Sequence, residues 1–167
     1  MLLNESPDTA ILRGPNHRMT TNGNGHVVRL QFCSAFDMLD FVQVVSDHLC
    51  KRLGFDEDAM HWVGVAVRES VINAIKHGNR QDPGKMVYVE FSTSEQPDHE
   101  LAISVRDEGE GFEPQEVADP LAPENMLKSS GRGIFLMKNF MDDVVLRKVP
   151  EGGMEVRMVK RLARAEA

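Results

Sequence analysis

The chain of 167 residues contains only two cysteines, Cys33 and Cys50, and this scarcity excludes several classes of protein. Two thiols cannot build the disulfide framework of a small secreted domain, and they lack the paired spacing of a zinc site. Both lie among apolar residues, so we predict that they are buried free thiols. Stability must then come from a hydrophobic core, for which a chain of this length is sufficient.

Long hydrophobic runs and excess positive charge are also missing. No stretch reaches the roughly 18 apolar residues of a membrane-spanning helix, and the N-terminus lacks a signal-peptide pattern. We therefore predict a cytoplasmic protein with no membrane partner. The chain has 19 Lys and Arg residues against 26 Asp and Glu residues, a net charge of −7. Binding to a phosphate backbone needs concentrated positive charge, so we predict no direct contact with nucleic acid.

The first 25 residues lack the regular apolar spacing of a helix or a strand. They are rich in Gly, Pro and Asn, and such a segment buries too little apolar surface to offset the entropy of ordering the chain. We predict a flexible arm over 1–25, one folded domain over 26–162 and a short tail over 163–167.

Apolar spacing within the folded domain changes between the period of strands and the period of helices. The segment 108–130 has no strong periodicity, and a loop of this length is often a functional lid. The predicted order, strand–helix–helix–strand–strand–lid–helix–strand–strand, indicates an α+β fold, a two-layer sandwich with helices over one face of a mixed β-sheet. The predicted strands are 26–32, 86–93, 101–106, 143–148 and 154–160, and the predicted helices are 35–53, 56–77 and 133–140.

Three polar residues recur at regular spacing in the second predicted helix, whose middle is largely apolar. Glu69, Asn73 and His77 are four residues apart and share one helix face. An Asn carbonyl oxygen suits Mg²⁺, which shares its coordination with phosphates and water. Glu69, one turn earlier, could accept a proton from an attacking hydroxyl. The same spacing also fits an exposed polar stripe, and His77 also fits a helix C-terminus, where it would complement the dipole.

Asp107 follows the predicted strand 101–106 and precedes two glycines, Gly109 and Gly111. A carboxylate at a strand end can accept a hydrogen bond from the exocyclic amine of adenine, which guanine lacks at that position. The glycines would allow the backbone to approach a planar base closely. An ordinary Asp-x-Gly turn has the same pattern, so the motif alone leaves both interpretations open.

Gly131, Arg132 and Gly133 directly precede the apolar run of the third predicted helix. The free N–H groups at a helix N-terminus form an anion site, and Arg132 could add a charged contact to a terminal phosphate. The spacing is neither a Walker A motif nor a dinucleotide-binding fingerprint. A glycine-rich loop that enters a helix without any ligand would look the same.

Taken together and in this order, the three segments resemble a known set of motifs. Arg68–Gly78, Asp107–Phe112 and Gly131–Gly133 resemble the N, G1 and G2 boxes of the GHKL ATP-binding superfamily. Within it, Arg68–Gly78 and Gly131–Asp142 are most similar to the stand-alone anti-sigma factor serine kinases. The resemblance covers about residues 27 to 160. It implies the Bergerat ATP-binding fold, with Mg-ATP as the cofactor.

The resemblance also implies a role for each matching residue. Glu69 would be the catalytic base that activates a target serine, and Asn73 would ligate Mg²⁺. His77 matches the motif, but we can assign it no role. The residues that would bind ATP, with Asp107 reading adenine and the last three closing over the phosphates, are Asn73, Asp107, Gly109, Gly111, Gly131, Arg132 and Gly133.

The activity and the partners follow from the same resemblance. Members of this family hold a sigma factor inactive and phosphorylate a serine on a STAS-domain anti-anti-sigma antagonist, which produces a partner switch. We predict a homodimeric protein-serine kinase and anti-sigma factor, with the exposed edge of the first strand as a candidate dimer surface. The alternative is a non-catalytic module in which ATP only stabilises a partner-binding conformation. Glu69 favours the kinase, because a binding module needs no base.

Overall fold

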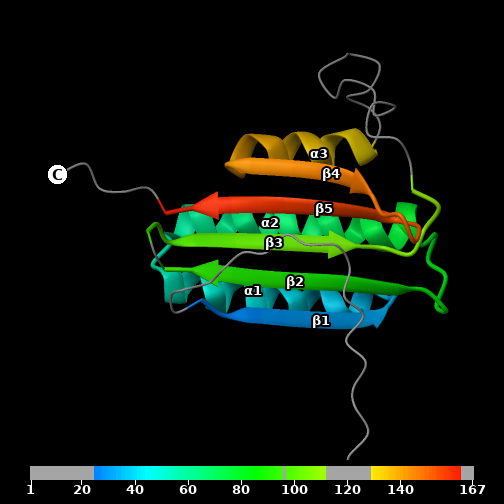
Figure 1. Ribbon diagram of the computed structural model, residues 1–167, viewed down its shortest axis with the longest axis horizontal. Helices are drawn as coiled ribbons and strands as arrows, with labels where there is room; N and C mark the ends of the chain where they lie inside the picture. The colour runs from blue at the N-terminus through cyan, green and yellow to red at the C-terminus, as the bar shows by residue number, and fades with distance from the viewer. Residues whose placement is uncertain (1–24, 96, 112–128, 163–167) are drawn as a thin grey trace, which may run out of the picture.

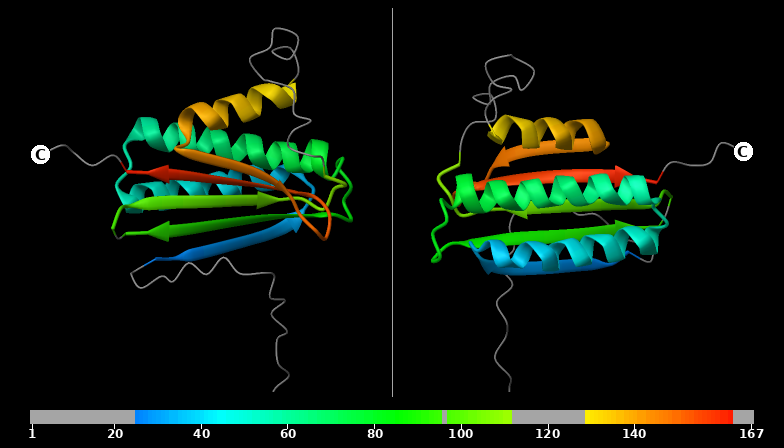
Figure 2. Two further views of the ribbon diagram at one scale, coloured as in Figure 1. Left: turned by 45° about the horizontal axis from the view of Figure 1, so that its top comes forward. Right: turned by 180° about the vertical axis from the view of Figure 1, so that it is seen from behind.

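A computed structural model describes residues 25–95, 97–111 and 129–162, although the side chains of 129–131 are not placed. Five strands form one sheet, and the helices pack against one of its faces (Figures 1 and 2). The predicted arm, Gly25 excepted, and the predicted tail 163–167 lie outside the described residues. So does most of the predicted lid, over 112–128.

Each predicted helix and strand is present, with ends that differ by a few residues at most. Within the described ranges, no helix is both long and apolar enough to cross a membrane. In chain order the elements are β1 (Val27–Cys33), the 3₁₀-helix η1 (Phe36–Met38), α1 (Leu39–Leu53), α2 (Glu57–Asn73), the π-helix η2 (Ala74–Gly78), β2 (Met86–Ser94), β3 (Glu100–Arg106), α3 (Ser129–Phe140), β4 (Asp143–Lys148) and β5 (Met154–Arg161).

The strand order is β1-β2-β3-β5-β4, and all four pairings are antiparallel. The predicted α+β two-layer sandwich is confirmed, but the prediction of a mixed sheet is wrong. Two helices separate β1 from β2, so the chain returns in the opposite direction. One helix separates β3 from β4 and would give parallel neighbours, but β5 lies between these two strands and pairs with both.

Local residue choices set the ends of the first two long helices. Gly54 follows α1 in the left-handed conformation, with φ of 84°, which glycine adopts without a steric penalty. Asp56 caps α2, because its side chain accepts a hydrogen bond of 2.7 Å from the backbone N–H of Ala59. The α-helical part of α2 ends at Asn73 rather than at His77, and the chain continues as one π-helical turn. Such turns are frequent at functional sites.

The core lies between the helices and the sheet. Helix α2 packs against β3, and α1 packs against β2 and β3 on the same face (Figure 2). Cys50 is buried, as predicted, and burial raises the pKa of its thiol to about 12. Cys33 is exposed, so that prediction is wrong; it is the last residue of the edge strand β1. The fully buried core side chains include Val63, Val67, Val71, Ile75, Phe91, Ile103 and Met158.

An aromatic stack holds the C-terminal end of α3 against α2. The rings of Trp62 and Phe140 are parallel within 3°, with centroids 3.5 Å apart. The ammonium group of Lys160, on β5, donates a hydrogen bond of 2.9 Å to the backbone carbonyl of Phe140. Helix α3 is therefore anchored at the end opposite to its glycine motif.

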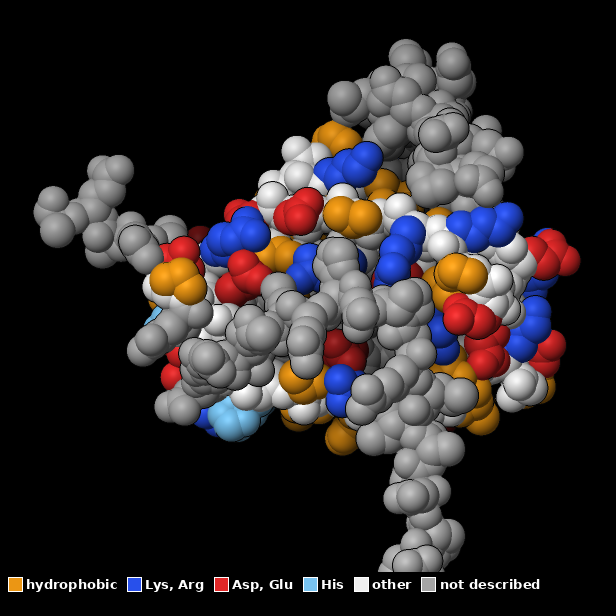
Figure 3. Space-filling model, in the orientation of Figure 1, with side chains coloured by type: hydrophobic (Ala, Val, Ile, Leu, Met, Phe, Trp, Pro, Cys, Tyr) orange, Lys and Arg blue, Asp and Glu red, His pale blue; other side chains and the backbone are white. Residues whose placement is uncertain are grey.

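The other face of the sheet carries side chains of both charges and faces the viewer in Figure 3. Arg29 pairs with Glu90 at 2.6 Å, and Arg147 pairs with Glu155. The guanidinium of Arg106 lies 4.3 Å from the centre of the Tyr88 ring. This polar face explains why the helices occupy only one side of the sheet.

Replacement of the helix cap should show how much the start of α2 contributes to stability. Asp56→Ala removes the acceptor for Ala59 N–H and should lower the free energy of unfolding by about 1 kcal/mol. Asp56→Asn keeps an acceptor oxygen and should cost much less. Urea denaturation of both variants measures this, and equal losses would show that the charge, not the cap, matters.

Candidate functional site

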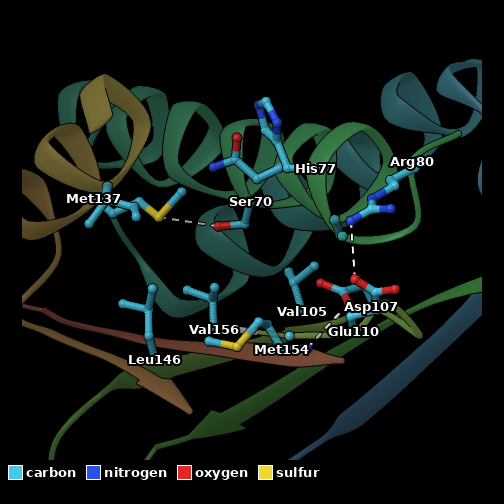
Figure 4. A pocket seen from close by; sticks show the side chains of 15 residues that line it. Ser70, His77, Arg80, Val105, Asp107, Glu110, Met137, Leu146, Met154 and Val156 are labelled. Atoms are coloured by element: carbon cyan, nitrogen blue, oxygen red, sulfur yellow. Dashed lines mark hydrogen bonds and ion pairs between the residues drawn. The ribbon is translucent and has the colours of Figure 1, made fainter. Parts of the chain in front are cut away.

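A cavity of about 280 Å³ lies between the helical layer and the sheet, at the C-terminal end of α2 (Figure 4). Its size approaches the lower end of the range for small-molecule sites. The floor is apolar and comes from Val105 on β3, Leu146 on β4, and Met154 and Val156 on β5. Polar side chains reach the cavity from α2, from η2 and from the end of β3.

Residues from the first two predicted motifs line this cavity. Asn73 and His77 come from the first motif, and Asp107 and Gly111 come from the second. The third motif reaches it through the residue that directly follows, Ile134. The fold therefore brings residues of the first two motifs to one cavity, and the third motif directly precedes a residue that lines it.

Three further predicted residues, Glu69, Gly109 and Gly133, lie next to residues that line the cavity. A Cβ atom on Gly133 would be 3.1 Å from Glu69 Oε2 and 3.2 Å from Asn73 Nδ2. The absence of a side chain at Gly133 thus lets α3 approach the polar face of α2. Gly109 packs in the same way against Gly78, where a Cβ atom would lie 2.2 Å from the carbonyl oxygen.

We predicted that the glycine motif directly precedes the apolar run of the third helix, at its N-terminus. In the structure the motif lies inside α3. The helix begins at Ser129, so its unbonded N–H groups include those of 129–131. Gly131 contributes to these free donors, whereas Arg132 and Gly133 do not, and the Arg132 side chain is exposed. Glycine lowers helix propensity by about 1 kcal/mol, and the close packing of Gly133 on α2 offsets that cost.

Asp107 is buried, with 5% of its surface exposed, at the end of the cavity. Its Oδ1 atom accepts hydrogen bonds from the backbone N–H groups of Gly109, at 2.8 Å, and Met154, at 3.2 Å. Burial raises the pKa of the Asp107 carboxyl, and these two hydrogen bonds oppose the rise. The carboxylate is thus held in one orientation by backbone groups from two separate segments.

Glycines surround Asp107 more closely than the sequence indicated. A Cβ atom on Gly78 would lie 2.3 Å from the Asp107 carboxyl carbon, and one on Gly153 would lie 2.1 Å from its backbone oxygen. Gly111 and Gly153 also have positive φ values of 71° and 92°. The sequence placed Gly78 at the end of the first motif and linked neither Gly78 nor Gly153 to Asp107, because no local pattern connects them to it.

An ion pair at the mouth of the cavity was also not predicted. Arg80 and Glu110 line the cavity from opposite sides, with a nitrogen–oxygen distance of 3.1 Å (Figure 4). Both side chains are largely exposed, so the pair contributes little stability. Arg80 and Gln81 have positive φ values of 53° and 58°, which are rare for residues with side chains. The turn after η2 therefore has a constrained backbone beside the site.

The donor set at the α2 end of the cavity suits a cation that shares its ligands with phosphates. Within the described ranges, no cluster of three or more His, Cys, Asp or Glu residues could hold a metal ion. The Asn73 amide lines the cavity, and Glu69 lies one turn before it. One amide oxygen and a nearby carboxylate match Mg²⁺, which keeps waters and phosphate oxygens as its other ligands.

Comparison with known proteins identifies the class to which this site belongs. The model of the histidine kinase-like ATPase domain matches residues 38–160, and the chain belongs to this family. Membership implies that the protein binds ATP. All the predicted site residues lie within the matched range.

Comparison with individual proteins finds relatives that are anti-sigma F factors. That of Bacillus velezensis (strain DSM 23117) is 32% identical over 144 residues, which cover 84% of this chain and 95% of the relative. That of Bacillus subtilis (strain 168) has the same identity and coverage. That of Oceanobacillus iheyensis is 33% identical over 141 residues, or 82% of this chain and 93% of the relative.

Asp107→Asn should separate stability from binding. Asn retains Oδ1 as the acceptor for the two backbone donors, and it removes the free-energy cost of burying an ionised carboxylate. A protonated Asp107 does not carry that cost. The free energy of unfolding of the variant should therefore exceed that of the wild type most at pH values above the raised pKa of Asp107, and the difference should shrink as the pH falls through that pKa. ATP affinity should fall about tenfold or more, because an amide N–H₂ would face the adenine amine.

Urea titrations from acid to neutral pH and calorimetric ATP titrations measure both effects. A variant that is less stable at every pH, or one that binds ATP as the wild type does, would contradict the assignment.

Gly78→Ala should disrupt the site far more than a comparable change nearby. The new methyl group would meet the Asp107 carboxyl at 2.3 Å, so the backbone or Asp107 must move. At the exposed Gly84, a Cβ atom would lie 3.2 Å from Asp82 Oδ1, and Gly84→Ala serves as the control. ATP titrations should show a loss of at least tenfold, on the order expected for a misplaced group, only for Gly78→Ala.

Proposed function

We propose that this protein is an ATP-dependent protein-serine kinase that also acts as an anti-sigma factor. Its protein substrate is a STAS-domain anti-anti-sigma antagonist. One observation carries the proposal: Glu69 and Asn73 meet α3 at Gly133, next to a cavity whose far end holds the buried Asp107. The similarity to anti-sigma F factors over most of the chain supports it.

The Asp107 end of the cavity has the properties of an adenine site. Backbone N–H groups fix the Asp107 carboxylate, which would accept a hydrogen bond from the adenine amine. The apolar side chains of Val105, Met154 and Val156 line the cavity beside it and would pack against the faces of the base. Gly78, Gly109 and Gly111 let the backbone segments pack directly against one another and against Asp107 at this end.

The other end would hold the phosphates. The free N–H groups of 129–131 and the positive end of the α3 dipole favour anions there. Arg132 would add positive charge. The Asn73 carbonyl would hold Mg²⁺, which neutralises charge on the phosphates when it is bound.

Glu69 would act on the protein substrate. It would take the proton that the target serine loses as the serine receives the phosphoryl group. Its carboxylate lies where α2 and α3 meet, within reach of the phosphate end. Phosphoryl transfer needs mainly positioning and charge neutralisation, which the other residues would supply.

The partners of the protein complete the proposal. The protein would bind a sigma factor and hold it inactive. Phosphorylation of the antagonist would prevent the antagonist from releasing the sigma factor. The protein would be a homodimer, with the edge of β1 as the candidate surface. Strand β1 lies at one edge of the described sheet and pairs only with β2 there.

A second candidate is a module that binds ATP without transferring phosphate. It is favoured by one observation: Glu69 is not among the side chains that line the cavity. In this alternative, ATP would only stabilise the conformation that binds the partner. The two candidates differ in whether label moves from ATP to protein.

The test is incubation of the full-length protein with γ-labelled Mg-ATP and a panel of STAS-domain proteins from the same genome. The kinase proposal expects label on a serine of one antagonist. Glu69→Gln should retain ATP affinity within about twofold and lose transfer by about 100-fold or more, since general base catalysis is worth that much. Nucleotide binding without transfer by the wild type would favour the binding module.

Asn73→Ala provides the matched variant for the phosphate end. It should abolish Mg²⁺-dependent ATP binding, whereas Glu69→Gln should not, and calorimetry with and without Mg²⁺ separates them. Intact Mg²⁺-dependent binding in Asn73→Ala would remove this residue from the site.

A further inference from the structure

Asn79 is a polar residue with 0% of its surface exposed, and the proposed mechanism does not use it. It directly follows η2, and its backbone N–H donates a hydrogen bond of 2.8 Å to the Ala74 carbonyl. A buried amide side chain is destabilising unless its donors and its acceptor are bonded. The bonds of Asn79 therefore show what the residue does.

Three hydrogen bonds connect the Asn79 side chain to three other segments. Its Nδ2 atom donates to Ser34 Oγ, at 2.7 Å, and to the Met86 carbonyl, at 2.9 Å. Its Oδ1 atom accepts from the Glu108 backbone N–H, at 2.7 Å. A carbonyl can only accept and a backbone N–H can only donate, so these partners fix the orientation of the amide.

The bond to Glu108 matters because Glu108 directly follows Asp107. The Glu108 carboxylate is itself held by the Tyr88 hydroxyl, at 2.7 Å, and by the Met86 backbone N–H, at 2.8 Å. These donors, Tyr88 first, lower the pKa of Glu108. The peptide between Asp107 and Glu108 is thus held by Asn79, while Met154 and Gly109 hold the Asp107 carboxylate.

We propose that Asn79 is a positioning residue that sets the location of the Asp107 carboxylate and thereby the selectivity of the site for adenine. This inference rests on the proposed role of Asp107 in reading adenine. Asn79 does not touch the nucleotide; it acts through the backbone of Glu108. Discrimination by one hydrogen bond depends on the acceptor's position, and a displacement of about 1 Å is enough to lose most of it.

The test compares two nucleotides that differ only at the base. ATP carries the 6-amino group, and purine riboside 5′-triphosphate lacks it, so their affinity ratio measures the contribution of Asp107. Calorimetry on the full-length protein with each nucleotide and Mg²⁺ gives the ratio. Melting temperatures establish that each variant is folded under the conditions used.

Asn79→Ala should reduce the affinity ratio at least about fivefold, because ATP binding weakens while purine riboside triphosphate binding changes little. Ser34→Ala is the matched control. It removes a partner of Nδ2, leaves the Glu108 bond intact, and should keep the wild-type ratio. Equal losses for both nucleotides in Asn79→Ala, or an unchanged ratio, would overturn the proposal.

A second variant covers the case in which Asn79→Ala does not fold. Asn79→Asp keeps an acceptor oxygen for Glu108 N–H but places the other oxygen against the Met86 carbonyl. Asn79→Asp should lower the melting temperature yet retain the wild-type ratio of the two nucleotide affinities. A ratio reduced as far as in Asp107→Asn would contradict the inference. The proposed function is judged separately: a wild-type protein that binds neither nucleotide refutes the ATP site itself, and one with a ratio of one refutes adenine reading by Asp107.

Discussion

The burial of the Asp107 carboxyl group constrains how the structure around it is built. A carboxylate out of water needs hydrogen-bond donors, and here they are backbone N–H groups of Gly109 and Met154. The chain can approach Asp107 this closely because Gly78 and Gly153 lack the Cβ atoms that would clash with it. The turn between β4 and β5 and the end of η2 must therefore meet at the end of β3.

The second constraint is the contact between α2 and α3. Gly133 allows the first turns of α3 to lie against Glu69 and Asn73, and the Trp62–Phe140 stack fixes the other end. The same contact closes one side of the cavity and places the free N–H groups of α3 near Asn73. Packing and the proposed phosphate site thus depend on a single helix pair.

The sequence predicted the elements well because each has a strong local signal, such as the Asp56 cap and the Gly54 helix end. The predictions from sequence failed where contacts between segments far apart in the chain determine the structure. The sheet is antiparallel because β5 inserts between β3 and β4, and α3 begins early because packing at Gly133 overrides the propensity of glycine. Asn79 was missed because its partner Glu108 is 29 residues away, with no local pattern to connect them.

The stack of Trp62 on Phe140 has a practical consequence, because Trp62 is the only tryptophan in the chain. Its emission arises at one place, the junction of α2 and the C-terminal end of α3. Any event that separates these helices removes the neighbouring ring and exposes the indole to water. The intrinsic fluorescence of the unlabelled protein is therefore an optical signal of the α2–α3 junction, readable on the millisecond scale without any added dye.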